Sequence, residues 1–263
     1  MRRIVLGIEY DGSRFLGWQT QPGGGAVQDA LEAALSAIAG AGTPVTCAGR
    51  TDRGVHARGQ VVHFDTGAVR PDSAWVRGVN ALLPDSVAVL WSSEAPGDFH
   101  ARYCARSRTY RYLLVNRPVR PALEARHAGW IHAPLDVEAM RAGARHFVGE
   151  HDFSALRSSA CQAKSPVRTL HSLEIEAAGA RIVFTIRANA FLHHMVRNIV
   201  GTLVYIGKGK HSPQWAGEVL ASRDRSRAAP TFAPEGLCLE HVEYEARWNL
   251  PDRPVRDALA QPA

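Results

Sequence analysis

The spacing of hydrophobic positions changes along the chain, and each spacing predicts a different element. The apolar run 4–9 ends at Asp11-Gly12, which indicates a buried strand closed by a turn. Apolar residues at positions 27, 31, 35 and 38, followed by Gly40, predict a helix. Further strands are predicted over 45–48, 59–65 and 87–92, and Asp72 is expected to cap a helix that reaches residue 80.

A similar mixture returns after about residue 105. The predicted strand 109–115 places Tyr110 and Tyr112 on one face, because side chains alternate along a strand. Two alternating stretches separated by a glycine turn predict a hairpin over 170–177 and 181–188. Helices are expected over 136–147 and 190–206, and again from Ser212-Pro213.

Strands and helices do not alternate strictly, so the pattern indicates an α+β fold with mainly antiparallel sheets. The return of this pattern of strands and helices after residue 105 predicts two similar α/β subdomains, 1–105 and 106–245. A loose Pro- and Arg-rich tail is expected over 246–263.

The charge balance points to a polyanionic partner. The net charge is +6 and the pI is about 9.4. Nearly all the cations are arginines, whose planar guanidinium grips phosphate with two hydrogen bonds and stacks on bases. A coding bias toward Arg would produce the same excess. The lysines are Lys164, Lys208 and Lys210.

Other compositional features exclude several classes. The four cysteines are scattered, with no paired spacing and no histidine at zinc-finger spacing, so neither a disulfide framework nor a metal site is indicated. The N-terminal apolar stretch is too short for a signal peptide, and no apolar run reaches the ~20 residues of a membrane span. We expect a soluble cytoplasmic protein without a membrane partner.

The segment 48–58 carries the candidate chemistry. It places one carboxylate, Asp52, among arginines 50, 53 and 58, with Gly49 and Gly54 on either side. Neighbouring cations favour the ionised carboxylate, which suits a nucleophile better than a general acid. The same residues would also fit a solvated turn with local ion pairs.

This segment resembles the signature of the tRNA pseudouridine synthase A family over the run Gly49-Arg50-Thr51-Asp52-x-Gly54-Val55-His56-Ala57. Further blocks resemble the same family in chain order, at 7–12 with Phe15 and 17–19, and at 59–64, 99–102, 108–112, 191–201 and 235–237. Two positions depart from the family pattern: Arg53 fills a slot that often holds a small residue, and Cys238 stands where an aromatic is common.

The resemblance implies a pseudouridine synthase fold, with two subdomains joined around a central RNA-binding cleft. It implies an isomerase that converts uridine to pseudouridine at positions 38, 39 and 40 of the tRNA anticodon stem-loop, as a homodimer and with neither cofactor nor metal. The family's essential carboxylate corresponds to Asp52. Whether it attacks C1′, attacks C6 or removes a sugar proton stays open.

The resemblance also assigns substrate-binding roles. Tyr110 would stack on the flipped uracil, and Leu237 would form an apolar wall of its pocket. Arg197 would pair with Asp52, and Arg50 would assist flipping of the base out of its helix. Without the resemblance, Arg197 would be interpreted as a structural arginine in an apolar helix and Arg50 as a phosphate contact. An RNA-binding surface is expected to include Arg58, Arg102 and Arg108.

Two rival functions fit parts of the sequence. A non-catalytic RNA-binding protein could use the same scaffold, and a glycoside hydrolase also labilises an anomeric carbon. Hydrolases usually need a second carboxylate, and the matched motifs near Asp52 supply none. The pair His193-His194 suggests a metal site, but adjacent residues on a helix point about 100° apart and rarely share one ion. His56 and His63 are expected to be structural.

Overall fold

A computed structural model describes residues 1–251, and the chain divides into two units. The first unit contains residues 1–106 and 238–251, and the second contains 107–237. The first boundary lies beside the expected one at residue 105. The chain then returns to the first unit at Cys238, whereas the second subdomain was expected to continue to 245. The reason is strand β10 (Leu237–Tyr244), which pairs in parallel with β3 (His56–Thr66) of the first unit.

The sheet of the first unit has the order β4-β1-β3-β10. Strand β1 (Arg2–Tyr10) is antiparallel to both β3 and β4 (Val87–Ala95), and short β2 (Thr46–Cys47) pairs with β3. Strands β1 to β4 correspond to the four predicted ones, although β3 begins three residues earlier than expected. The early start shortens the polar segment, so that the loop ends at Val55.

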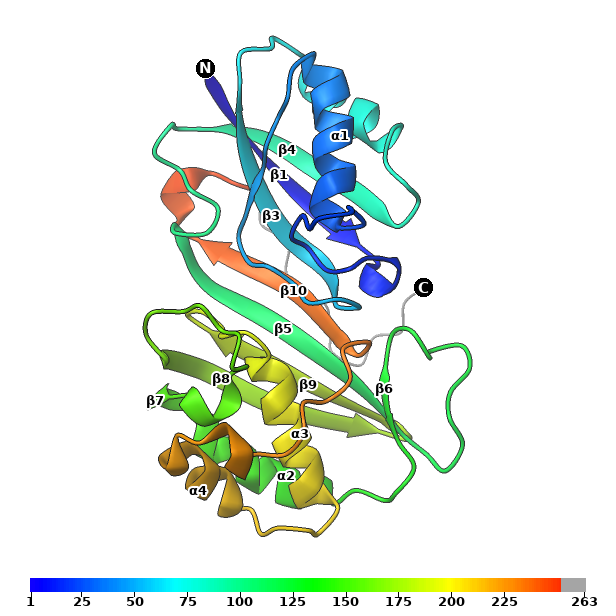
Figure 1. Ribbon diagram of the computed structural model, residues 1–263, viewed down its shortest axis with the longest axis vertical. Helices are drawn as coiled ribbons and strands as arrows, with labels where there is room; N and C mark the ends of the chain where they lie inside the picture. The colour runs from blue at the N-terminus through cyan, green and yellow to red at the C-terminus, as the bar shows by residue number, and fades with distance from the viewer. Residues whose placement is uncertain (252–263) are drawn as a thin grey trace. The chain divides into compact units, whose positions relative to one another are not determined.

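Helical segments cover one face of this sheet (Figure 1). Helix α1 (Val27–Ala39) buries Leu31 and Leu35 and ends at Gly40, whose φ of 77° suits a residue without a Cβ. The helix predicted over 72–80 is present, but its centre, Ala74–Gly78, is a π-helix. Trp75 from that turn packs edge-on against Phe64 of β3, so the predicted helix completes the core.

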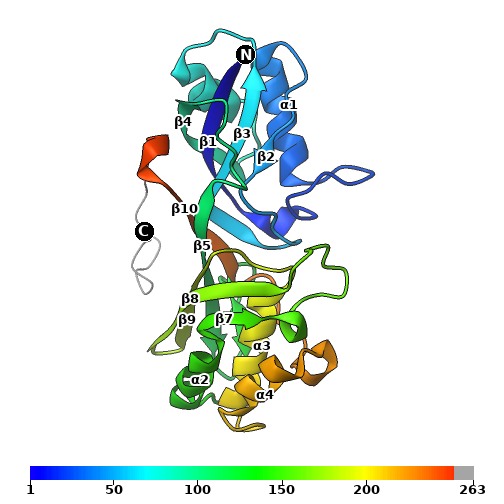
Figure 2. The ribbon, with the colours of Figure 1, turned by 90° about the vertical axis from the view of Figure 1, so that its left-hand side faces the viewer.

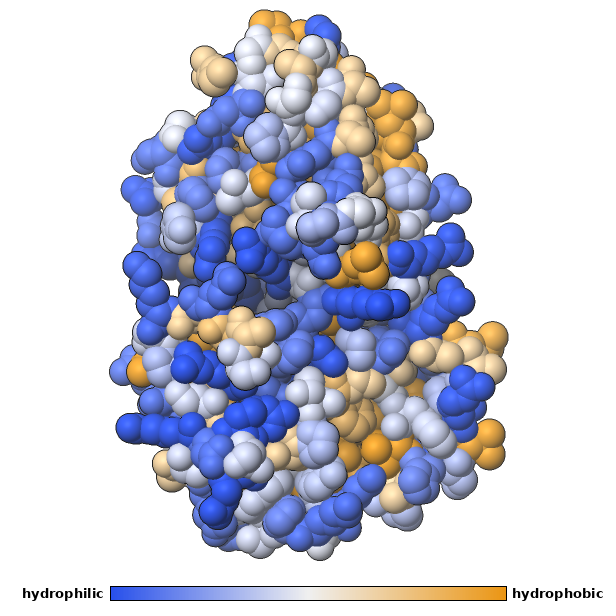
Figure 3. Space-filling model, in the orientation of Figure 1, coloured by the Kyte–Doolittle hydropathy of each residue, from blue (hydrophilic) through white to orange (hydrophobic). Residues whose placement is uncertain are grey.

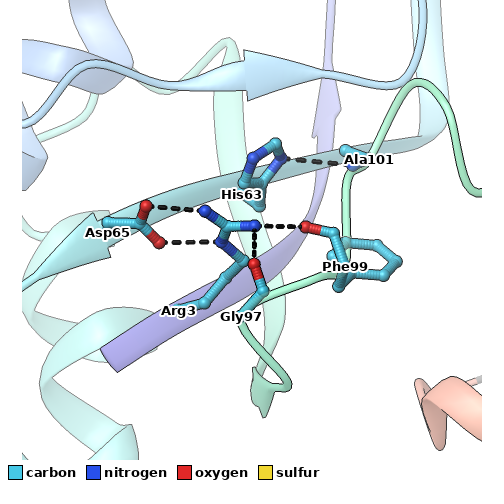
Figure 4. A network of polar contacts seen from close by, with 6 residues as sticks. All are labelled: Arg3, His63, Asp65, Gly97, Phe99 and Ala101. Atoms are coloured by element: carbon cyan, nitrogen blue, oxygen red, sulfur yellow. Dashed lines mark hydrogen bonds and ion pairs between the residues drawn. The ribbon is translucent and has the colours of Figure 1, made fainter. Parts of the chain in front are cut away.

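The opposite face of this sheet carries a second, smaller apolar cluster. Phe99 is fully buried, and its ring lies 5.2 Å from those of Tyr244 and Trp248. Arg3 secures the segment: it donates to the carbonyls of Phe99 and Gly97 and forms a two-bond ion pair with Asp65 (Figure 4). The region expected as a loose tail thus begins with a folded turn, η6 (Ala246–Trp248), and the rest of that expected tail, from 252, lies outside the described residues.

His63 lies beside this cluster and accepts a hydrogen bond from the Ala101 amide (Figure 4). The residue is only 6% exposed, and burial, with the nearby His100 and Arg3, lowers its pKa to about 4. The unfolded chain therefore binds a proton at this position below about pH 6.5, while the folded chain stays neutral there until about pH 4. This histidine is structural, as the sequence suggested.

We expect acid to destabilise the first unit through His63. The free energy of unfolding should fall between pH 6.5 and 4, by at most about 3 kcal/mol. Asp65 titrates below this window, because its bond to Arg3 lowers its pKa below 3.8. Urea titrations at pH 7 and 4.5 measure the effect, with His63→Asn as control. If the free energy of unfolding falls equally in wild type and in His63→Asn, His63 is not the cause.

The second unit repeats the plan with a sheet of order β5-β9-β8-β7. Strands β5 (Ala105–Asn116), β9 (Arg181–Ala188), β8 (Val167–Ala178) and β7 (Gly149–Asp152) pair antiparallel, and β6 (Gly129–Ile131) pairs in parallel with β5. The predicted hairpin is β8–β9. Helices α2 (Val137–Ala144), α3 (Met195–Gly207) and α4 (Trp215–Ser222) pack against one another, and α2 and α4 also contact strands β8 and β7 of this sheet (Figure 2).

Two helix starts differ from the sequence expectations. Helix α3 begins at Met195 and not at Ala190, because His194 adopts a left-handed conformation with φ of 65°. Helix α4 begins at Trp215, after a turn formed by Ser212 and Pro213. Asp136 caps α2 as expected, since its Oδ1 accepts from the Ala139 amide at 2.9 Å.

The visible face in Figure 3 is mostly hydrophilic, with apolar side chains in separate small areas. Within the described residues, no helix combines the length and the apolar character that crossing a membrane requires.

Candidate active site

The Asp52 loop joins β2 to β3 in the first unit and is held by backbone hydrogen bonds. Ala48 donates to the Val61 carbonyl at 2.8 Å, and Val55 donates to the Asp52 carbonyl at 3.1 Å across a turn. Gly54 occupies that turn with φ of 81°, a conformation that favours glycine. Asp52 is half-buried, while Arg50 and Arg53 are exposed on either side of it. A carboxylate on a fixed loop between strands is a suitable reactive group.

Two glycines from the N-terminal segment let the chain approach this loop. A Cβ on Gly12 would lie 1.9 Å from the Val55 carbonyl oxygen, and one on Gly17 would lie 2.9 Å from the Thr51 carbonyl oxygen. The amide of Trp18 donates to the same Thr51 oxygen at 3.0 Å. The opening motif is therefore packed directly against the loop.

We expect Gly12→Ala to displace the Asp52 loop. Its methyl group would overlap a backbone oxygen that cannot rotate away, so the free energy of unfolding should fall by about 3 kcal/mol. Turnover on tRNA should fall as well. Gly42→Ala is the matched control, because nothing lies within 4 Å of its Cβ position. Thermal unfolding and steady-state rates measure both effects, and a Gly12→Ala protein as stable and active as the control would contradict this close packing.

The second unit contains three of the expected substrate-binding residues, Tyr110, Arg197 and Leu237. Tyr110 and Tyr112 lie on the same face of β5, opposite Ile186 and Phe184 of β9. Tyr110 is buried, with its ring centroid 5.0 Å from that of Phe191 in an edge-on contact. An aromatic ring held in this way can present its remaining surface to a planar base.

Arg197 lies in the first turn of α3 and is half-buried. Its Nε donates to the Phe232 carbonyl at 2.8 Å, and the Phe232 amide donates back to the Arg197 carbonyl at 3.2 Å. The Phe232 ring lies 5.7 Å from that of Tyr112. These contacts fix the guanidinium relative to β5, so Arg197 is more than a solvated surface charge.

Leu237 is buried at the end of the segment that passes beside β5. The preceding Gly236 accepts a hydrogen bond from the Leu113 amide at 2.9 Å, and a Cβ there would overlap the Leu113 carbonyl oxygen. Tyr112 donates its hydroxyl proton to the Ala233 carbonyl, and burial raises the pKa of this phenol. Tyr112 is thus a core residue.

The three arginines expected on an RNA-binding surface have different environments. Arg102 is exposed. Arg58 is half-buried, with its guanidinium 3.6 Å from the buried carboxylate of Glu240. Arg108 is 8% exposed and donates to the Asn189 carbonyl at 2.9 Å. The sequence around these arginines gives no signal that separates the buried one from the exposed one.

The histidine pair also differs from its expected geometry. His193 and His194 precede helix α3, and their ring centroids are 4.0 Å apart. They therefore do not diverge by the 100° that separates adjacent residues of a helix. His56 is buried at the start of β3, where its Nδ1 accepts from the Gly12 amide at 3.1 Å.

Comparison with known proteins identifies the family. The tRNA pseudouridine synthase family matches residues 7–104 and 144–245. The chain belongs to this family. The resemblance found in the loop and in the other motif blocks is thereby confirmed, together with the pseudouridine synthase fold class.

Relatives of the family match along almost the whole chain. A protein of Aromatoleum aromaticum is 59% identical over 249 residues, covering 95% of this chain and 94% of that protein. Relatives from Dechloromonas aromatica and Bordetella parapertussis are 57% and 58% identical over 250 and 252 residues, with coverage of 95% of this chain in both cases and 95% and 93% of the relatives. All three are named tRNA pseudouridine synthase A. Among solved structures, a Cbf5-Nop10-Gar1 complex matches at 12% identity and a TM-score of 0.40, covering 90% of this chain and 48% of that chain.

Proposed function

We propose that this protein isomerises uridine to pseudouridine in tRNA. The observation that carries this proposal is the match to family members named tRNA pseudouridine synthase A over 95% of the chain at 57–59% identity. The segment 48–55 supports the same proposal chemically, because it holds a candidate catalytic carboxylate, Asp52, half-buried in a loop fixed by backbone hydrogen bonds.

The reaction is a rearrangement within one nucleotide. The bond between uracil N1 and ribose C1′ breaks, the base turns, and C5 bonds to C1′. The hydrogen on C5 leaves as a proton, and N1 gains one. Atoms and electrons balance without an added reactant, so the proposed reaction needs neither cofactor nor metal.

Asp52 is the proposed catalytic carboxylate. Attack on C1′, attack on C6 and removal of a sugar proton each begin from an ionised carboxylate held close to the nucleoside. We propose that Tyr110 stacks on the flipped uracil, Leu237 supplies an apolar wall, and Arg197 supplies a positive charge near the reacting nucleotide. Arg50, exposed two residues before Asp52, would contact the RNA where the base leaves its helix.

The proposed substrate region is the anticodon stem-loop, at positions 38, 39 and 40, and the proposed active form is a homodimer acting in the cytoplasm. The net charge of +6 and the exposed Arg102 support binding of a phosphate backbone. Such binding reads the shape of RNA more than its sequence.

Tritium release tests the proposed activity. tRNA labelled with tritium at uridine C5 should lose label to water when incubated with the protein, because C5 exchanges its hydrogen for the bond to C1′. Binding of tRNA without release would support the rival binding protein. Free uracil or an abasic product would support the rival hydrolase.

A further inference from the structure

Buried polar side chains lie beneath the Asp52 loop and bond to the residues just before Asp52. The hydroxyl of Tyr10 is 2.9 Å from that of Thr51, the residue that precedes Asp52. Tyr10 is 4% exposed and Thr51 is 7% exposed. Their hydrogen bond therefore forms away from solvent, between the end of β1 and the loop.

A second contact holds the loop two residues before Thr51. The side-chain amide of Gln60 in β3 donates to the Gly49 carbonyl at 2.6 Å, and its Nε2 is 3.4 Å from the Tyr10 hydroxyl. Gln60 is fully buried. The two anchored residues, Gly49 and Thr51, lie on either side of Arg50 and lead directly into Asp52.

These polar groups lie next to a run of apolar residues on each strand. Strand β1 buries Ile4, Leu6 and Ile8, and β3 buries Val62 and Phe64, all apolar. Tyr10 and Gln60 place polar groups among these apolar residues where the two strands reach the loop. A buried amide or hydroxyl costs free energy unless it is hydrogen-bonded, and an apolar residue would fill the space without that cost. What the polar residues add is a fixed direction for the loop backbone.

We propose that Tyr10 and Gln60 are positioning residues that hold Asp52 in its reactive conformation. This proposal rests on the proposed function, which makes Asp52 the catalytic carboxylate. Through Thr51 and Gly49 the two side chains set the backbone from which Asp52 projects. Displacing a reacting group by about 1 Å can lower a rate about 100-fold, so their loss should reduce kcat and leave tRNA binding nearly unchanged.

Tyr10→Phe and Gln60→Met test the proposal, because each removes hydrogen-bonding groups and keeps most of the side-chain volume. We expect kcat to fall about 10-fold in the first and about 10- to 100-fold in the second, with the KM for tRNA changed less than about twofold. At the loop itself, Thr51→Ser should keep most of the activity, and Thr51→Val should lose as much as Tyr10→Phe.

Matched controls separate positioning from a general loss of stability. Tyr244→Phe removes a half-buried hydroxyl that donates to the Ala101 carbonyl at 2.6 Å in the same unit. Asn80→Leu removes a side-chain amide that forms two hydrogen bonds to the backbone of Val89. Both controls should lose stability and keep kcat.

A double variant makes the test independent of the size of the single effects. If the Tyr10–Thr51 bond acts as one unit, Tyr10→Phe with Thr51→Val should lose no more kcat than either change alone. Additive losses, or equal kcat losses in the Tyr244→Phe control, would overturn the positioning role. Full kcat in Tyr10→Phe and Gln60→Met beside an inactive Asp52→Asn would also overturn it and leave the proposed function intact. An active Asp52→Asn would instead remove the proposed role of Asp52.

Discussion

Asp52→Asn is expected to abolish turnover, by at least about a thousand-fold in kcat, while the protein stays folded. The substitution keeps the size of the side chain and removes its negative charge, so that no nucleophile or base remains at that position. The fold should tolerate the change, because backbone groups and the side chains of Thr51, Tyr10 and Gln60 also hold the loop.

Single-turnover rates on unmodified tRNA measure this effect, with thermal unfolding and tRNA affinity as controls for structure. Both controls should agree with wild type within about twofold in affinity and a few degrees in Tm. Full activity in Asp52→Asn would remove this carboxylate from the mechanism. A variant that no longer binds tRNA would show that Asp52 acts in binding and not in chemistry.

Arg197→Leu has the second-largest expected effect, a loss of about 100-fold in kcat together with about 1–2 kcal/mol of stability. The activity should fall because a positive charge proposed to act near the reacting nucleotide is removed. The stability should fall because the Phe232 carbonyl loses the donor that lies 2.8 Å away.

Arg141→Leu is the matched control for Arg197→Leu. The Nε of Arg141 also donates to a backbone carbonyl, that of Ile175, at 2.8 Å in the same unit. We expect Arg141→Leu to lose similar stability and to keep kcat. If the two variants lose the same activity, the effect of Arg197 is structural. If Arg197→Leu keeps full activity, the proposed role of its charge is wrong.

The sequence predicted most of the helices and strands that have a clear signal within their own residues. Helix α1 has a clean helical spacing and a terminal glycine, and the β8–β9 hairpin has alternation and a tight turn. Strand β10 was not predicted, because its partner in β3 lies about 180 residues earlier in the chain, and local spacing gives no signal for such a pairing. The start of α3 was missed because its left-handed residue, His194, is a histidine rather than a glycine.

The candidate site was predicted only in part, for the same physical reason. The motif around Asp52 is local and can be recognised from the sequence. Tyr10 and Gln60 were within the matched blocks, but their contacts with the loop join residues 41 and 11 positions apart. Burial likewise separates Arg108 from Arg102, although both are arginines in basic stretches. Hydrogen-bond partners and burial require the folded chain.

The most direct test of the central claim is nucleoside analysis of tRNA taken from a strain that lacks this activity and incubated with the purified protein. The account predicts that pseudouridine appears at positions 38–40 with an equal loss of uridine, that no uracil is released, and that Asp52→Asn protein produces none. Uridine that remains unchanged at every position after incubation with wild-type protein would contradict it.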